Sequence, residues 1–198
     1  DNNGIVIHLT LVPYLSAAGE LKTKPTQHSV KTLMESGIKA DILVCRTEHE
    51  ISSDIKDKLA LFCNVKREAV IQSIDASTIY DVPILMQEEG LDTVTLHKLA
   101  LPDNTQPDLT RWRQFLERHK NPKHEVTIGL IGKYVELQDS YKSILESFIH
   151  AGAVNEVRVN VRSIHSEHIN MNKLDQSMKG LDGILVAPGF GERGIEGK

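Results

Sequence analysis

The stretch "ADILVCR", residues 40–46, is an almost continuous apolar run that ends at a charged arginine. Successive side chains of a β-strand point to opposite faces of the sheet, so a strand that is apolar throughout needs cover on both faces. Such strands are typical of parallel sheets that carry helices on both sides. The stretch therefore predicts an inner strand of an α/β fold.

The segments around this run alternate between strand and helix patterns. Gly37 ends one helical pattern, and Ser52 or Ser53 is placed to cap the start of the next. A later helical pattern contains Pro83, which is expected to interrupt it. The predicted order is strand 5–13, helix 26–37, strand 40–46, helix 52–65, strand 68–74 and helix 77–90.

The alternation stops in residues 102–124 and then restarts. This part holds three prolines and a charged amphipathic helix containing Trp112, so it predicts a linker whose tryptophan packs on a domain. After it come strand 125–134, helix 140–152 ended by Gly152, strand 156–164, helix 172–180 and an apolar strand within 181–191.

The pattern predicts an α/β protein of two incomplete three-layer units with mainly parallel sheets. The expected domains are residues 1–101 and 125–198, joined by the linker 102–124. The second domain has only three predicted strands in β-α-β-α-β order, the first half of a doubly wound sheet, so it is expected to be truncated.

Composition narrows the class of protein. The 198 residues carry a net charge of −4, which does not favour nucleic-acid binding, and hold no apolar run of about 18 residues that would span a membrane. The two cysteines, Cys45 and Cys63, lie in apolar runs and are expected to be reduced, buried thiols of a cytoplasmic protein.

The segment "GELKTKPTQHS", residues 19–29, is the first candidate binding site. Lys22 and Lys24 precede Pro25, which presets the backbone at the start of a helix. Ammonium groups and a helix N-terminus together favour a phosphate group. The alternative is a solvated basic loop before a capped helix.

Two glycine turns in the second half are further candidates. Gly132-Lys133-Tyr134 follows a predicted strand, where α/β sheets commonly bind ligands, but the P-loop spacing is absent and an ordinary tight turn stays possible. The turn 189–191, Gly-Phe-Gly, is either an oxyanion hole or a simple connection. Neither cysteine has flanking glycines as a nucleophile would, and "HSEH", residues 165–168, reads as a solvated loop with a weak metal-like spacing.

Taken together, these motifs resemble the CTP synthase family over essentially the whole chain. The resemblance rests on "GELKTKPTQHSVKTLMESGIKADILVCR" at 19–46, "VTIGLIGKYVELQDSYKSILESF" at 126–148 and "GFGERGIEG" at 189–197. It implies a P-loop-like synthetase domain followed by a flavodoxin-like class I glutaminase domain. It also implies ATP- and Mg²⁺-dependent amination of UTP to CTP with ammonia from glutamine, activation by GTP, inhibition by CTP, and a homotetramer.

The resemblance assigns nucleotide-binding residues in the first domain. The family's UTP- and CTP-binding segment and a further nucleotide-contacting lysine match Lys22, Thr23, Lys24, Pro25, Thr26, Gln27 and Lys58. The segment that contacts ATP matches Ile74, Asp75 and Ala76. The family often has lysine where this chain has Ile74, a change that backbone contacts to the nucleotide would survive.

In the second domain the resemblance assigns Gly189 to the oxyanion and glutamine-binding position. Pro188 stands where the family usually has glycine, which removes one N–H group from the turn.

The resemblance also implies parts that these 198 residues do not contain: the phosphate-binding loop, the acidic Mg²⁺ ligands and the Cys-His-Glu triad, whose cysteine is expected after Lys198. No metal ligands are therefore predicted, and the chain alone is expected to be inactive in both half-reactions. Two alternatives remain, namely a non-catalytic nucleotide-binding or assembly module and a stand-alone glutamine amidotransferase subunit. The lysine-rich segment argues against the second.

Overall fold

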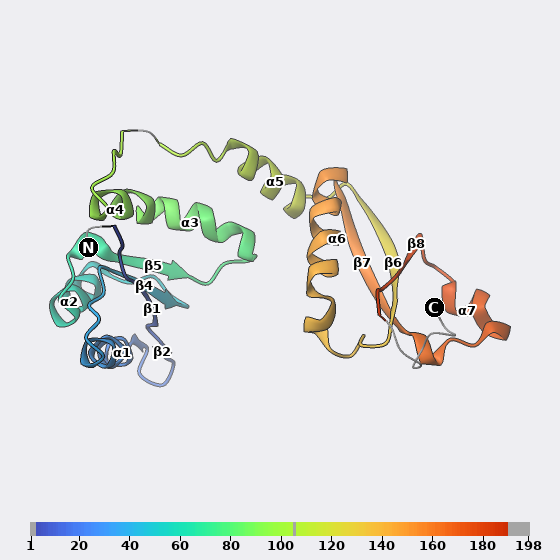
Figure 1. Cartoon of the computed structure of the whole chain (residues 1–198), viewed down its shortest axis with the longest axis horizontal. Helices are drawn as coiled ribbons and strands as arrows, with labels where there is room; N and C mark the ends of the chain where they lie inside the picture. Colours follow the sequence, from blue (N-terminus) through green and yellow to red (C-terminus); the bar gives the residue numbers. More distant parts are fainter. Residues whose placement is uncertain (1–2, 105, 190–198) are drawn as a thin grey trace. The chain divides into compact units, whose positions relative to one another are not determined.

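The computed structural model describes residues 3–104 and 106–189. The chain divides into two compact units, Asp1–Asp108 and Leu109–Lys198, which are described separately below (Figure 1). The division falls inside the predicted linker.

Unit 1 is built on a parallel sheet with the strand order β1-β4-β5. Helices α1 and α2 lie on one face of this sheet, and α3 and α4 lie on the other (Figure 1). A small antiparallel pair, β2 and β3, follows β1. The elements are β1 (Ile7–Leu11), β2 (Tyr14–Leu15), β3 (Glu20–Leu21), α1 (Lys24–Glu35), β4 (Ile42–Thr47), α2 (Ser53–Cys63), η1 (Arg67–Ala69), β5 (Val70–Ile74), η2 (Ile79–Asp81), α3 (Val82–Glu88) and α4 (Leu91–Lys98).

The apolar run at 40–46 forms the middle strand, as predicted. Leu43 and Cys45 pack under α1 and α2, while Ile42 and Val44 pack toward the side of α3 and α4. Both cysteines are free thiols in the first of these cores. The strand is therefore buried on both faces because helices cover the sheet from both sides.

In unit 1, the expectation for residues 77–90 needs correction, whereas Ser52, one of the two predicted N-caps of the helical pattern 52–65, is confirmed. Pro83 does not interrupt a helix: it lies in the first turn of α3, where the missing N–H group costs nothing. The predicted helix 77–90 instead divides into a short 3-10 turn and α3. Ser52 is the N-cap of α2, and its side chain accepts a hydrogen bond from Ile55 N, 3.4 Å away.

Unit 2 contains a second parallel sheet, with the strand order β7-β6-β8. Its elements are α5 (Thr110–Lys120), β6 (His124–Gly132), η3 (Gln138–Tyr141), α6 (Lys142–Asn155), β7 (Val157–His165), η4 (Ser166–His168), η5 (Met171–Lys173), α7 (Leu174–Met178) and β8 (Gly183–Val186). With both three-stranded sheets parallel, the predicted α/β class is confirmed.

Helix α5 packs on α6 within unit 2. The ring of Phe115 lies edge-on to His150 of α6, with the ring centroids 5.7 Å apart, and Trp112 lies 5.5 Å from Phe115. Phe115 thus joins the predicted linker helix to α6, whereas the contact of Trp112 with Phe115 lies within α5.

Helix α6 does not stop at Gly152, contrary to the prediction. It runs on to Asn155 and ends at Glu156 in the left-handed conformation. Gly152 is buried, and a Cβ atom there would lie 2.5 Å from the carbonyl oxygen of Val157. The glycine is therefore required by the close approach of β7 rather than by a helix end.

Within the described residues, no helix is both long and apolar enough to cross a membrane.

Candidate functional site

The predicted nucleotide segment forms the start of α1. Thr23 is the N-cap, Lys24 is the first helical residue and Pro25 follows it. The Thr23 side chain does not cap a backbone N–H group; its hydroxyl oxygen accepts a hydrogen bond from Gln27 Nε2 at 3.0 Å. The first turn of the helix therefore lacks a side-chain cap on its N–H groups, which favours an anion there.

Thr26 has a structural role inside this segment. It is fully buried, and its hydroxyl donates to the carbonyl oxygen of Leu11 at 2.9 Å. The same hydroxyl oxygen accepts from Thr10 Oγ1 at 3.2 Å. These bonds join the start of α1 to the carboxyl end of β1. They therefore hold Lys22 and Lys24 near the carboxyl ends of the strands.

A groove beside β1 and α1 contains one residue of the UTP-matching segment, Pro25. It has a volume of about 460 Å³ and is lined by Leu9, Thr10, Leu11, Pro25, Ser29 and Arg46. Arg46 Nη2 lies 3.2 Å from Asp75 Oδ1, and Asp75 N donates to the carbonyl oxygen of Thr47. Arg46 thus lines the groove with Pro25 and pairs with a residue of the ATP-matching segment 74–76, near the carboxyl ends of parallel strands, where α/β folds commonly bind ligands.

The lysines of the site differ in their partners. Lys22 forms an ion pair with Glu20, whereas Lys24 and Lys58 are exposed and make no ion pair with any residue in 3–104 or 106–189. The hydrogen bond and charge of Lys22 hold the pKa of Glu20 below its usual value, and the charge of Lys58 acts in the same direction. Lys58 belongs to α2.

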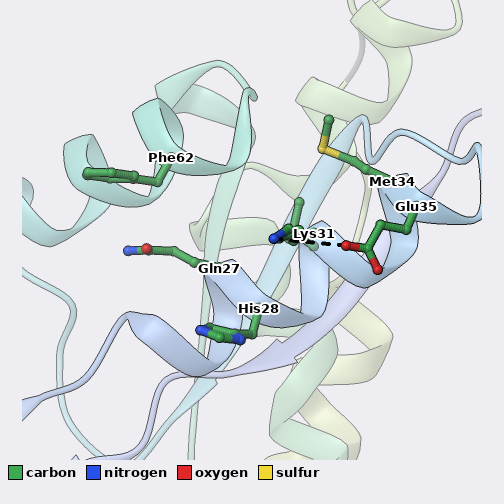
Figure 2. Close-up of a pocket in the computed structure, with 7 residues that line it drawn as sticks. Gln27, His28, Lys31, Met34, Glu35 and Phe62 are labelled. Atoms are coloured by element: carbon green, nitrogen blue, oxygen red, sulfur yellow. Dashed lines mark ion pairs between the residues drawn. The ribbon is translucent and has the colours of Figure 1, made fainter.

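A second groove lies between α1 and α2 and was not predicted from the sequence (Figure 2). It has a volume of about 470 Å³, and its walls are Gln27, His28, Val30, Lys31, Met34, Glu35 and Phe62. Gln27 is the only member of the predicted nucleotide segment that lines it. Helical spacing groups Phe62 with Ile55 and Leu59 as apolar residues of α2, so the sequence did not show that Phe62 is 62% exposed and lines a groove.

In unit 2, the two glycine turns lie at one end of the sheet. Ala187, directly after β8, donates its N–H to Ile131 of β6, so Gly189 and Gly132 follow neighbouring strands. A Cβ atom on Gly132 would lie 2.3 Å from the Tyr141 hydroxyl oxygen, so the close packing of Tyr141 requires glycine at this position. Gly189 has φ of +152°, a conformation that favours glycine. Phe190 and Gly191, also part of the predicted oxyanion turn, lie outside the described residues.

The chain's own nucleophile and metal candidates do not form a site. Burial raises the pKa of Cys45 to about 12 and that of Cys63 to about 11, so both thiols stay protonated and unreactive at neutral pH. The rings of His165 and His168 stack with centroids 4.6 Å apart. In the described part of the chain, no three His, Cys, Asp or Glu residues are grouped to hold a metal ion.

Comparisons with known proteins agree on one family. The family described as CTP synthase N-terminus matches residues 1–101. Proteins named CTP synthase from Flavobacterium psychrophilum and Christiangramia forsetii are each 79% identical over all 198 residues, and one from Methanocaldococcus jannaschii is 55% identical over 99% of the chain.

The chain spans 36 to 37% of the length of these relatives. Because the family match covers more than half of the chain and sequence identity extends across both units, the chain belongs to the CTP synthase family.

Proposed function

We propose that this chain contributes the nucleotide-binding edge of unit 1 and a glutamine-binding turn of unit 2 to an enzyme that makes CTP from UTP. The observation that carries the proposal is the groove at the carboxyl edge of the first sheet. There Pro25, from the UTP-matching segment, and Arg46, the ion-pair partner of Asp75 in the ATP-matching segment, line the same groove.

The proposed chemistry has two steps at the UTP base. The γ-phosphoryl group of ATP is transferred to O4 of the uracil ring, and ammonia then attacks C4 and expels inorganic phosphate. Mg²⁺ would supply charge neutralisation on the ATP phosphates, and its ligands are not assigned to residues of this chain. Lys24 and Lys58 would hold the phosphate groups of UTP by charge-assisted hydrogen bonds.

Unit 2 would take part in supplying the ammonia. The N–H group of Gly189 is proposed to stabilise the oxyanion that forms when glutamine is hydrolysed. Pro188 offers no N–H group, so the backbone donors must come from Gly189 and its neighbours. A cytoplasmic homotetramer activated by GTP is part of the same proposal, by analogy with the family.

A chimeric enzyme tests this proposal. The chain replaces the matching 198-residue stretch of the Flavobacterium psychrophilum CTP synthase, to which it is 79% identical. The chimera is expected to form CTP from UTP, ATP and glutamine, whereas the chain alone is expected to show no turnover. A chimera that folds and binds nucleotides but forms no CTP would instead support a non-catalytic module.

Lys24 provides the residue-level test in the chimera. Replacing Lys24 with Ala removes a charge that has no ion-pair partner in the described residues, so the half-saturating UTP concentration should rise by about tenfold. Lys31→Ala is the matched control, since Lys31 lies on the same helix but 4.0 Å from Glu35. Steady-state kinetics with UTP varied would show equal effects of both variants if the proposal were wrong.

A further inference from the structure

We infer that Glu20 is an internal counter-ion that competes with the phosphate groups of UTP for Lys22. This inference rests on the proposed function and adds a residue that sets nucleotide affinity. The carboxylate of Glu20 pairs with Lys22, which lies two residues later and is the first residue of the lysine-rich segment 22–27. A ligand that binds Lys22 through a phosphate oxygen therefore competes with this carboxylate for the ammonium group.

The position of Glu20 is fixed by the small hairpin. Glu20 belongs to β3, which pairs with β2, and the ring of Tyr14 in β2 lies 4.1 Å from that of His49. After the hairpin, Lys22 N donates to the carbonyl oxygen of Pro13 at 2.9 Å. Backbone pairing thus fixes Glu20 and Lys22 two residues apart in an extended segment, which places the carboxylate and the ammonium group on the same side of the chain.

The ion pair can nevertheless be exchanged for a ligand. The side chains of Glu20 and Lys22 are 58% and 42% exposed, so water and phosphate groups reach both partners. Ion pairs with this exposure contribute little to stability, because water screens them. Glu20 therefore neutralises Lys22 in the free protein, yet both partners stay accessible to an incoming anion.

This arrangement favours ligands with several negative charges. A single phosphate group would only replace the Glu20 carboxylate, whereas a triphosphate can bind Lys22 while its remaining charges reach Lys24 and Lys58. Glu20 is thus expected to lower the affinity for every anion and to weaken binding most for those with few charges. Its removal should strengthen UTP binding without changing the chemical step.

The test uses Glu20→Gln in the chimera with the Flavobacterium psychrophilum enzyme. The half-saturating UTP concentration should fall by about two- to fivefold, while kcat and the half-saturating ATP concentration stay unchanged. The gain should shrink between about 50 mM and about 500 mM salt, because screening weakens exposed charges. A purely structural role of Glu20 would not produce this salt dependence.

Glu68→Gln is the matched control. Glu68 pairs with Lys66, also two residues away, at 3.6 Å and with similar exposure, but it lies on η1 outside the lysine-rich segment. This variant should leave UTP saturation unchanged.

The remaining outcomes distinguish failure of the inference about Glu20 from failure of the proposed function. If Glu20→Gln raises the half-saturating UTP concentration or leaves it unchanged in an active chimera, the competition by Glu20 is refuted and the proposed function stands. An unsubstituted chimera that makes no CTP refutes the proposed function, and the inference falls with it.

Discussion

Within the six residues from Lys22 to Gln27, exposed charge and buried anchoring are divided between neighbours. Thr26 is buried, and its hydroxyl is committed to Leu11 and Thr10, whereas Lys24 is exposed. Pro25 sits in the first helical turn, where its missing N–H group is harmless. The segment therefore presents its charges because its small polar residue anchors it to the strand beneath.

The buried thiols make stability depend on pH above the neutral range. Burial raises the pKa of Cys45 from 9.0 to about 12 and that of Cys63 to about 11. Above about pH 9 the unfolded chain loses thiol protons that the folded chain keeps, so the free energy of unfolding must fall as pH rises. Each thiol should contribute a slope of at most about 1.4 kcal/mol per pH unit, up to its folded pKa.

Urea unfolding followed by circular dichroism between about pH 8 and pH 10 measures this slope. Cys45→Ala will also leave a cavity, which shifts the whole curve, so the comparison is between slopes and not between absolute stabilities. The slope should be smaller in Cys45→Ala and in Cys63→Ala than in the parent chain. Equal slopes in all three proteins would show that the thiols are not buried as described.

At the scale of elements, the contact between α6 and β7 predicts an unusual effect of alanine. In an exposed helix interior, replacing glycine with alanine stabilises by about 1 kcal/mol. At Gly152 the added Cβ atom would lie 2.5 Å from the Val157 carbonyl oxygen and 3.3 Å from Val159 Cγ2. Gly152→Ala should therefore destabilise the chain by about 1–3 kcal/mol, measured by urea unfolding.

The neighbouring residue provides the control for Gly152. Ala151 is exposed on the same helix, so Ala151→Gly should cost only the helix propensity difference of about 1 kcal/mol. A Gly152→Ala variant as stable as the parent would mean that α6 can move away from β7 at no cost.

Secondary structure was predictable from the sequence wherever an apolar pattern was continuous. The strand at 40–46 and the helix ending near Gly37 were clear for this reason. Helix α4 was missed, since it has no fully buried residue and only part of its surface, including Leu91 and Val94, packs on the sheet. The strands β2 and β3 span two residues each, too few to show a period.

The candidate site was only partly predictable for a related reason. The lysine-rich segment was visible as a local pattern before a helix. The approach of Arg46 to Asp75 joins residues far apart in the sequence, so only the fold reveals it. Glu20 was not identified because its hairpin pairing has no sequence signature at this length.

At the scale of the whole molecule, the two edges of the first sheet differ: within residues 3–104 and 106–189, β1 pairs with β4 alone, whereas the edge strand β5 is protected. On β5, the backbone N–H of Gln72 donates to Glu89 Oε2 at 2.9 Å, which blocks further pairing there. On β1, Ile7, Leu9 and Leu11 are 46%, 61% and 55% exposed, and Leu9 and Leu11 also line the groove beside α1. A contiguous apolar strip of this kind on an edge strand is typical of a protein–protein contact surface.

The chain expressed by itself is therefore expected to bind hydrophobic dyes and to associate through β1. Leu9→Thr places a β-branched residue, which strands favour, in β1 and removes apolar surface, so dye fluorescence and light scattering should both fall, by roughly half. Val154→Thr is the control, because Val154 is 68% exposed but lies on α6 in unit 2. If both variants changed association equally, general surface hydrophobicity and not the β1 strip would drive it. A parent chain that stays monomeric and binds no dye would refute the prediction outright.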